Sequence, residues 1–495
     1  MKFARSAVIL STLPFLLITK SLAADWPPVT PDELKMTAEP LAPGAPAIIV
    51  YRQVDRDDIQ SRQYNYVRIK ILKEEGRERA NVELEYVKDQ SNIHDIKART
   101  IRPDGSIVNF EGKPYDKTLV KAKGVRYLAK TFTMPDVQVG SIIEYSYVYE
   151  WGPFGCYLVF DSHWILNEDL FTKHAKFSLR PNSCFAVRWT WRDLPPGTGT
   201  PNIEKGVIRL DAQNIPGFET EDYMPPENEL KARVDFIYSN DDEKDPTKYW
   251  KKVGKSLYES VENFAGKRKG IEQAASQIVS PADPPEMKLK KLYARAQQIR
   301  NLSYETEKTA QEERREKLKQ INNVEDVWKR GYGDGGDITW LYLALVRAAG
   351  FEAYPVFVSR RDEYFFTPQL PDSHRLNDTV VLVKLKGKDL YLDPGTAFTP
   401  FGLLPWPETG VPGLKLDKEG GAWVRTTMPE GSASRVIRTA DLALSETGDI
   451  EGKLTITFTG LSASGRRLEE RNEDEADRKT FLEDEAKGHY SKKCE

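Results

Sequence analysis

The seven-residue run 331–337, Gly-Tyr-Gly-Asp-Gly-Gly-Asp, precedes an apolar helical pattern and could frame a nucleophilic site. Asp334 can cap the helix that follows, and Asp337, near the third helical position, favours the positive end of the helix dipole. A thiol at such a helix start has a lowered pKa and becomes a nucleophile. Residues 185–493 contain no cysteine. The run therefore predicts a capped helix start to which no nearby cysteine can supply a thiol nucleophile.

The elements around this run predict an α+β domain. Apolar residues recur at helical spacing after the run, and Gly350 follows the last of them as a typical helix end. Three further helical stretches precede the run, and three strands follow it. The predicted helices cover about 246–264, 271–278, 289–299 and 338–349, and the strands cover 354–359, 379–385 and 390–393.

The preceding part of the chain predicts an antiparallel β-sandwich. Residues 45–150 alternate in the manner of half-buried strands, with turn chemistry at 103–106. Strands continue to about residue 191, and a Pro/Gly-rich break follows at 195–201. Near the other end, residues 406–425 are rich in proline and glycine and are predicted to be a linker. The last part, 426–495, predicts a hairpin over 435–460 and a charged, helical tail.

With these residues in view, residues 246–405 resemble the bacterial transglutaminase-like domain of the papain-like cysteine-enzyme superfamily. The specific motifs are Trp328–Gly350 and Asn377–Pro394, which includes Leu-Asp-Pro at 392–394. Residues 24–240 look like the β-rich domain of unknown function that commonly precedes it in exported bacterial proteins. Residues 426–495 resemble the start of a β domain that often follows. The resemblance implies a multidomain chain with a papain-like second domain.

The resemblance places the family's Cys, His and Asp triad on Gly335, Asp378 and Asp393. Only the third position keeps its residue type. Glycine supplies no nucleophile, and a carboxylate cannot replace imidazole as a proton carrier at neutral pH without a large pKa shift. His374 is expected in a solvated loop, and Thr339 is expected to pack within its helix. The usual thiol chemistry is therefore predicted to be lost.

The same mapping suggests a pair of facing carboxylates. If the scaffold is kept, Asp378 and Asp393 are neighbours, and like charges at that distance share a proton or recruit a cation. Asp334 and Asp337 could add oxygen ligands for a hard cation such as calcium. The alternative is that these aspartates are separate, solvated or capping residues. No other cofactor is expected.

A binding groove is the second hypothesis for these positions. Gly335 is expected to open space at a helix N-terminus, where a carboxylate of a ligand could sit. Trp328, Tyr332 and Trp340 could line the groove beside Asp334, Asp378 and Asp393, although core packing is the commoner fate of an aromatic such as Trp340.

The first residues predict export. Lys2 and Arg5 precede an apolar stretch at 7–18, and small residues at 21 and 23 suit cleavage, so residues 1–23 are predicted to be a signal peptide. No other stretch is long and apolar enough to span a bilayer. A formal net charge of −3 with 30% charged residues argues against a nucleic-acid partner. The expected location is the periplasm or the exterior.

Cysteine use leaves two alternatives. In an oxidising compartment Cys156 and Cys184 could form a disulfide, because both fall in one β-rich region. Two separate buried thiols are the other interpretation. Cys494 would then remain unpaired.

Two functions from different classes follow from the sequence. The first is an exported protein that has lost catalysis and binds a peptide, a protein or a cell-envelope polymer. The second is a hydrolase or transferase of the transglutaminase-like type that uses an aspartate-based or metal-assisted site.

Overall fold

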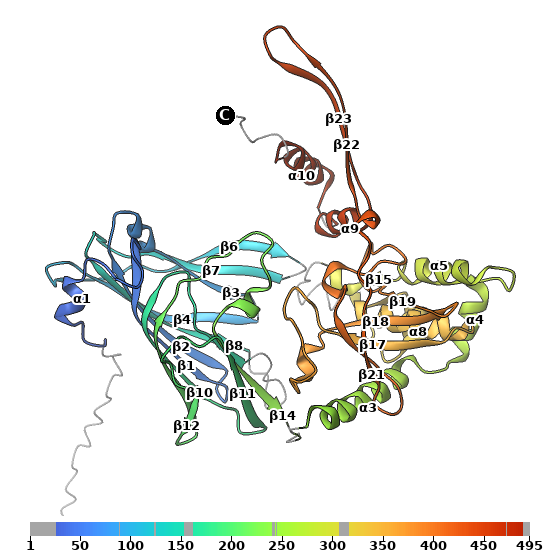
Figure 1. The fold of residues 1–495 in the computed structure, drawn as a ribbon, viewed down its shortest axis with the longest axis horizontal. Coiled ribbons are helices and arrows are strands. Elements are labelled where there is room, and N and C mark those ends of the chain that lie inside the picture. Colours follow the sequence, from blue (N-terminus) through green and yellow to red (C-terminus); the bar gives the residue numbers. More distant parts are fainter. Residues whose placement is uncertain are drawn as a thin grey trace, which may run out of the picture.

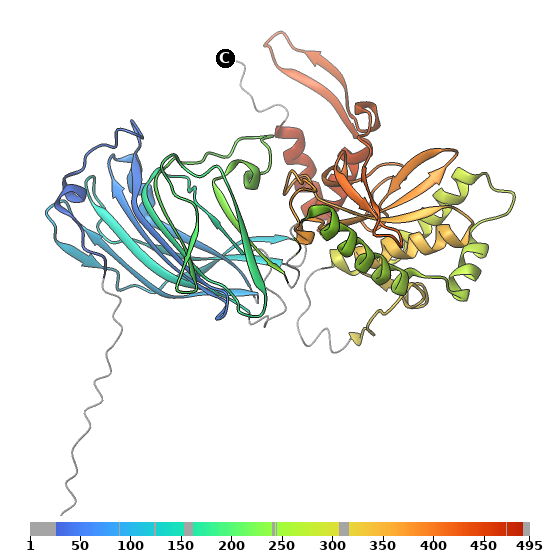
Figure 2. The same cartoon turned by 60° about the horizontal axis from the view of Figure 1, so that its bottom comes forward.

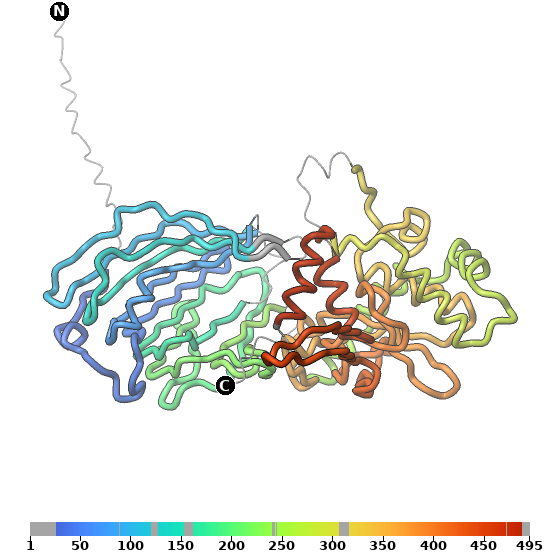
Figure 3. Tube along the Cα trace, turned by 90° about the horizontal axis from the view of Figure 1, so that it is seen from above, coloured from blue at the N-terminus to red at the C-terminus, as the bar shows by residue number. Residues whose placement is uncertain are grey.

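A computed structural model describes residues 26–488 apart from 89, 123, 124, 153–161, 240–242, 244, 306–315 and 472. The predicted signal peptide lies outside the described residues. Two domains lie side by side along the longest axis (Figures 1 and 3). The first domain, residues 26–239, is made of β-strands, and the second, residues 245–425, combines helices with a sheet. The C-terminal segment, 426–488, follows the second domain.

The first domain is built on an eight-stranded sheet in the order β12-β13-β10-β1-β2-β8-β4-β5. Its first strand pairs with β2 in antiparallel and with β10 in parallel. The predicted purely antiparallel arrangement is therefore wrong, because a strand over one hundred residues away joins the sheet beside the first strand. The strands are β1 (Ala47–Asp57), β2 (Arg62–Ile71), β4 (Ser91–Ile101), β5 (Ile107–Asn109), β8 (Ile142–Trp151), β10 (Thr172–Arg180), β12 (Asn202–Glu204) and β13 (Val207–Ile215).

Two three-stranded sheets pack on one face of this large sheet. The sheet β3-β7-β6 encloses one apolar core with β2, β4 and β8, and the sheet β11-β14-β9 encloses a second core with β10 and β13. Alternating apolar residues on each strand supply both cores. The strands are β3 (Asn81–Val87), β6 (Tyr115–Ala122), β7 (Val125–Thr133), β9 (Ser162–Ile165), β11 (Ala186–Arg192) and β14 (Arg233–Ser239), and the short helices are α1 (Pro31–Lys35) and α2 (Glu227–Leu230).

The second domain packs helices against a five-stranded sheet in the order β19-β18-β17-β20-β21 (Figure 2). The central helix α8 is apolar on nearly every side, and its Leu341 and Leu345 are fully buried between the sheet and the other helices. The helices are α3 (Pro246–Ala265), α4 (Lys269–Ile278), α5 (Pro285–Ala296), α7 (Val324–Arg330) and α8 (Gly335–Ala348). The strands are β15 (Arg300–Asn301), β16 (Tyr332–Gly333), β17 (Ala353–Val358), β18 (Asp378–Leu385), β19 (Lys388–Leu392), β20 (Pro412–Lys415) and β21 (Ala422–Arg425).

The stretch 406–425 is part of this sheet, so the predicted linker is wrong. Its glycines mark close packing of the backbone. A β-carbon on Gly413 would lie 2.8 Å from Val356 Cγ1, and one on Gly421 would lie 2.2 Å from the Lys415 carbonyl oxygen. The composition that suggested a flexible connection reflects strands that approach their neighbours too closely for side chains.

The C-terminal segment forms the predicted hairpin and two helices. The hairpin β22 (Val436–Leu444) and β23 (Ile450–Phe458) projects from the second domain (Figure 1). Helices α9 (Gly460–Glu469) and α10 (Glu475–Gly488) follow it, and Arg466 of the former contacts Glu485 of the latter. Within the described residues, none of the helices has the length and apolar character needed to cross a membrane.

Candidate functional site

The start of helix α8 is fixed by a reciprocal pair of aspartates. The Asp337 amide donates to Asp334 Oδ1 at 2.7 Å, and the Asp334 amide donates to Asp337 Oδ2 at 3.1 Å. This capping box follows from the three-residue spacing of two acids before an apolar run. Burial, and then the charge of Asp334, raises the pKa of Asp337 to about 6.

Gly335, the first residue of the helix, faces the backbone of Gly395 and not an open space. A β-carbon on Gly335 would lie 3.1 Å from the Gly395 carbonyl oxygen. A β-carbon on Gly395 would lie only 2.2 Å from the Gly335 carbonyl oxygen and 2.4 Å from Thr339 Oγ1. The Gly335 amide also donates to Ser303 Oγ at 3.0 Å. The expected space for a ligand carboxylate is thus filled, because a turn after Asp393 packs on the helix start.

Asp393 lies beneath this turn and is 3% exposed. Its Oδ1 accepts from Thr339 Oγ1 at 3.0 Å and from the Gly395 amide at 2.8 Å, and its Oδ2 accepts from the Thr396 amide at 3.0 Å. The carboxylate therefore ties the end of β19 to helix α8. Thr339, predicted to be a packing residue, is a buried donor to it.

Asp378 begins β18 and is paired with a third acid, Glu408. Its side chain is 30% exposed, whereas Glu408 is 1% exposed. The two carboxyl groups are hydrogen-bonded to each other, and Glu408 Oε2 has no partner within the described part of the chain. Arg360 Nη1 lies 3.9 Å from Asp378 Oδ2, but that guanidinium is engaged mainly by Asp362, at 2.6 Å.

Burial raises the pKa of each of the three acids. Burial, followed by the charges of Asp393 and Asp378, raises the pKa of Glu408 well above its usual value, so Glu408 carries the shared proton and donates it to Asp378. Burial and the charge of Asp378 raise the pKa of Asp393 to about 6. Burial also raises the pKa of Asp378 itself. The arrangement is a carboxyl–carboxylate pair with a second buried acid behind it.

The predicted calcium ligands are not gathered into one site. Asp334 and Asp337 are occupied by capping, and Asp393 by backbone amides. No group of three or more His, Cys, Asp or Glu residues within the described ranges has an arrangement that could hold a metal ion.

The three aromatic residues considered for a groove have structural contacts. Trp340 packs against Phe357 with ring centroids 5.7 Å apart, and the Arg295 guanidinium lies 4.5 Å from the Trp328 ring. The Tyr332 hydroxyl donates to the Lys319 carbonyl at 2.9 Å.

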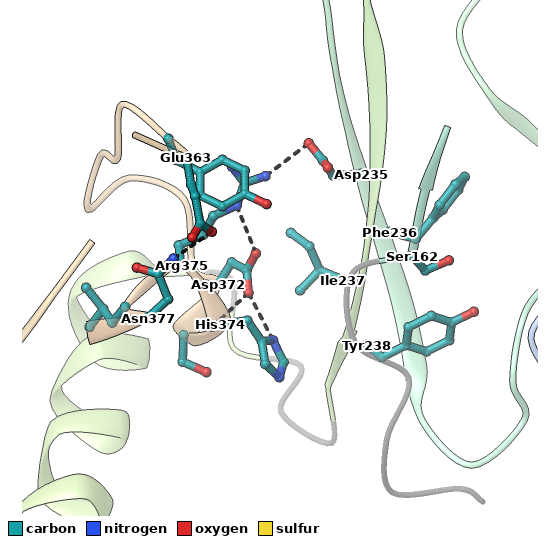
Figure 4. A pocket seen from close by; sticks show the side chains of 13 residues that line it. Ser162, Asp235, Phe236, Ile237, Tyr238, Glu363, Asp372, His374, Arg375 and Asn377 are labelled. Carbon is teal, nitrogen blue, oxygen red and sulfur yellow. Dashed lines mark hydrogen bonds and ion pairs between the residues drawn. The ribbon is translucent and has the colours of Figure 1, made fainter. Parts of the chain in front are cut away.

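A pocket of about 490 Å³ lies between the domains, beside the residue that precedes Asp378 (Figure 4). Strand β14 forms one wall and the segment 363–377 forms the other. Arg375 Nη2 lies 3.0 Å from Asp235 of the first domain, and its guanidinium carbon lies 3.8 Å from the centre of the Tyr364 ring. His374 Nδ1 lies 3.2 Å from Asp372 Oδ1. Burial raises the pKa of Asp372, but contacts with His374 and Arg375 outweigh it, so that the net shift is downward. We refer to this feature as the interdomain pocket.

No pattern in the sequence indicated Glu408 or Arg375 as a site residue. Glu408 follows a proline in the stretch predicted to be a linker, and no spacing connects it with Asp378 or Asp393. Arg375 lies in an irregular segment, and its partner Asp235 is in the other domain. Only the three-dimensional arrangement reveals either residue.

Cys184 is disulfide-bonded. Its predicted partner, Cys156, lies outside the described residues, so the pairing of these two cysteines stays a prediction.

Comparison with protein families identifies part of the first domain. Residues 57–219 match the family model DUF3857, described as a domain of unknown function with a solved structure. The β-rich region thus matches a domain of unknown function over these residues, as the resemblance implied. No curated protein matches this chain.

Two solved structures extend the comparison. The chain is similar to a "putative protease" from Parabacteroides distasonis, with a TM-score of 0.51 and 14% identity over 78% of this chain and 72% of that one. At this identity the likeness is one of fold. The second is Legionella pneumophila aminopeptidase A in complex with aspartic acid, with a TM-score of 0.23 and 8% identity over 45% of this chain and 28% of that one. The second similarity is too low to support an argument.

Proposed function

We propose that the second domain is a transglutaminase-like domain that has lost catalysis, and that the exported protein serves as a binding module for a peptide, a protein or an envelope polymer. The main support for this proposal is the contact between Gly335 and Gly395. The position at which this class of enzyme holds its thiol has no side chain, and a neighbouring carbonyl oxygen lies 3.1 Å from where a β-carbon would stand. Thiol catalysis needs both a nucleophile and room for an acyl intermediate.

The interdomain pocket is the place where we expect the partner to bind. Its volume lies in the range of ligand sites, which occur preferentially between domains. It adjoins the former catalytic positions through Asn377, whose side chain contacts Glu363 at 2.8 Å. A fold that keeps this cleft while filling the nucleophile position retains binding without turnover.

Two measurements test this proposal. The mature protein should neither hydrolyse amides nor join glutamine to lysine, and pull-down from envelope extracts should recover a partner. The variant His374→Glu, at a half-exposed position of the pocket, should lose that partner. The variant Lys418→Glu, at an exposed position outside the pocket, should keep it. Partner recovery that is the same for both variants would contradict binding at this pocket.

A second candidate, a hydrolase based on carboxyl groups, is favoured by one observation. Glu408 and Asp378 share a proton, as paired carboxyls do in acid–base catalysis, and the side chain of Asp378 is 30% exposed. Turnover of peptide or ester substrates that disappears in Asp378→Asn would support this candidate. Turnover that persists in that variant would exclude this pair as the catalyst.

A further inference from the structure

The large sheet of the first domain has one face that neither three-stranded sheet covers. The N-terminal segment makes apolar contacts with one end of this face, at Ile48 and Val50, and the rest of it is mainly polar. In β1 the residues on it include Tyr51, Gln53 and Asp55. The strand register places Lys176 of β10 beside Gln53, and Asp211 of β13 beside Lys176. A sheet that packs one face on the core commonly has polar residues on its solvated face, so the polarity alone does not indicate a ligand.

Two hollows on this face adjoin each other, and we treat them together as one groove. They have volumes of about 530 and 630 Å³ and share Tyr51 and Lys176 as lining residues. The N-terminal segment 27–36 borders the first hollow, and residues 199–204 border the second. We call this feature the sheet groove. Its two parts each fall in the size range of small-ligand sites.

The floor of the sheet groove is held in place by hydrogen bonds between its own side chains. The Tyr51 hydroxyl donates to Gln53 Oε1 at 3.0 Å, and Gln53 Nε2 donates to Asp55 Oδ2 at 2.5 Å. Ser178 Oγ donates to Asp55 Oδ1 at 2.5 Å. The Tyr51 ring is also fixed, with centroids 5.3 Å from the His174 ring and 5.8 Å from the Tyr66 ring. Such a preorganised surface loses little entropy when a ligand binds.

Beside this fixed floor stand polar groups that have no partner. Lys176, Arg209, Asn202 and Glu204 are exposed, and none of their side chains has a hydrogen bond or ion pair with another described residue. Lys176 and Arg209 lie on neighbouring strands, because Arg209 is opposite Ser178 in the register. Free donors and acceptors therefore lie along the second hollow, whose lining also includes the aromatic ring of Tyr51.

The charges along the sheet groove select among ligand classes. Five carboxylates and four permanent cations line it, which leaves almost no net charge: Asp32, Glu33, Asp55, Glu204 and Asp211 against Arg68, Lys173, Lys176 and Arg209. A polyanion such as a nucleic acid needs an excess of cations. A neutral, polyhydroxylated chain needs many donors and acceptors, together with an aromatic surface for the apolar face of a sugar ring.

We propose that the sheet groove binds a neutral saccharide chain. The Tyr51 ring packs against one sugar ring of the chain, and Lys176, Arg209 and Asn202 form hydrogen bonds with hydroxyl groups of this and the following sugar rings. This site lies wholly on the first domain. It goes beyond the binding function of the second domain and does not depend on whether that domain is catalytic.

The test is calorimetric titration of the full mature chain with neutral hexasaccharides: β-1,4-linked N-acetylglucosamine, β-1,4-linked glucose and α-1,4-linked glucose. At least one should bind. Arg209→Ala and Lys176→Ala should each weaken binding about 5- to 10-fold, by loss of one or two hydrogen bonds. Both residues are exposed and unpartnered among the described residues, so the substitutions leave no buried group unsatisfied.

Lys97→Ala is the matched control. Lys97 is an exposed lysine on the same face of the same sheet, opposite Ser146 in the register, but it does not line the groove. Its substitution should leave affinity unchanged. Absence of binding by all three neutral hexasaccharides, binding only by the polyanion hexagalacturonate, or equal loss in Lys97→Ala would each overturn the proposal. Failure of the pocket variants in the second domain would leave these results unaffected, so the two proposals fail separately.

Discussion

Two buried glutamates, one in each domain, have opposite surroundings. Glu144 of the first domain is fully buried, and its oxygens accept from Arg68 Nε at 2.7 Å and Arg99 Nε at 2.5 Å. The Tyr66 hydroxyl is a third donor. Glu408 of the second domain is equally buried, but the charges that affect its pKa most are those of two other acids, and one of its oxygens has no partner among the described residues. One carboxylate is neutralised by cations, and the other is neutralised by a proton.

From this difference we infer that Glu144 has a structural role, whereas we attribute Glu408 to a former catalytic site. A buried ion pair surrounded by donors is consistent with stability alone. A cluster of like charges is costly, and clusters of this kind concentrate at functional positions. In our interpretation, the cluster has this form because Asp378 stands where an imidazole would have been a neutral or cationic partner for Asp393.

Removal of the Glu144 charge, which Arg68 and Arg99 neutralise, should destabilise the protein most. Glu144→Gln should lower the free energy of unfolding by about 3 kcal/mol, because Arg99 would lose its carboxylate partner and the buried Arg68 would keep only Glu33. Urea unfolding of the full chain measures this. Glu150→Gln, on the same strand but 54% exposed and in contact with His94, should change stability by less than about 0.5 kcal/mol. If the two variants changed stability equally, the claim that the ion pairs of Glu144 stabilise the first domain would be wrong.

An intermediate effect on stability is expected where the turn at Gly395 packs on the start of helix α8. Gly395→Ala should destabilise the second domain by about 1–3 kcal/mol, because its β-carbon would collide with the Gly335 carbonyl and with Thr339. Gly336→Ala provides the control, since a β-carbon there would meet only Asp334 Oδ1, at 3.4 Å, and alanine favours a helix. If Gly395→Ala were as stable as Gly336→Ala, the turn would be free to move, and the site could open.

The parts of the site that sequence could predict are those set by local spacing. The acids at 334 and 337 are three residues apart before an apolar run, which defined the capping box and the start of α8. The alternation of apolar and polar residues predicted the strands β18 and β19. Glu408 could not be predicted, because strands β18 and β19 separate it from Asp378 along the chain and it lies in a stretch whose prolines and glycines resembled a linker. The parallel neighbour of β1 was missed for the same reason, since pairing over a long separation leaves no local pattern.

The smallest expected effect is a dependence on pH that distinguishes the two glutamates. Folding raises the pKa of Glu408 and Asp393, so the native state binds more protons than the unfolded state above about pH 4. The unfolding free energy of the second domain should therefore fall as pH rises from about 4 through 6. Glu408→Gln keeps the shape of the protonated side chain without its titration, so it should gain on the order of 1 kcal/mol relative to the wild type by pH 7.5. Urea unfolding at pH 4.5, 6 and 7.5 checks the sign, and a difference between the two proteins that does not change with pH would show that Glu408 is ionised in the folded state.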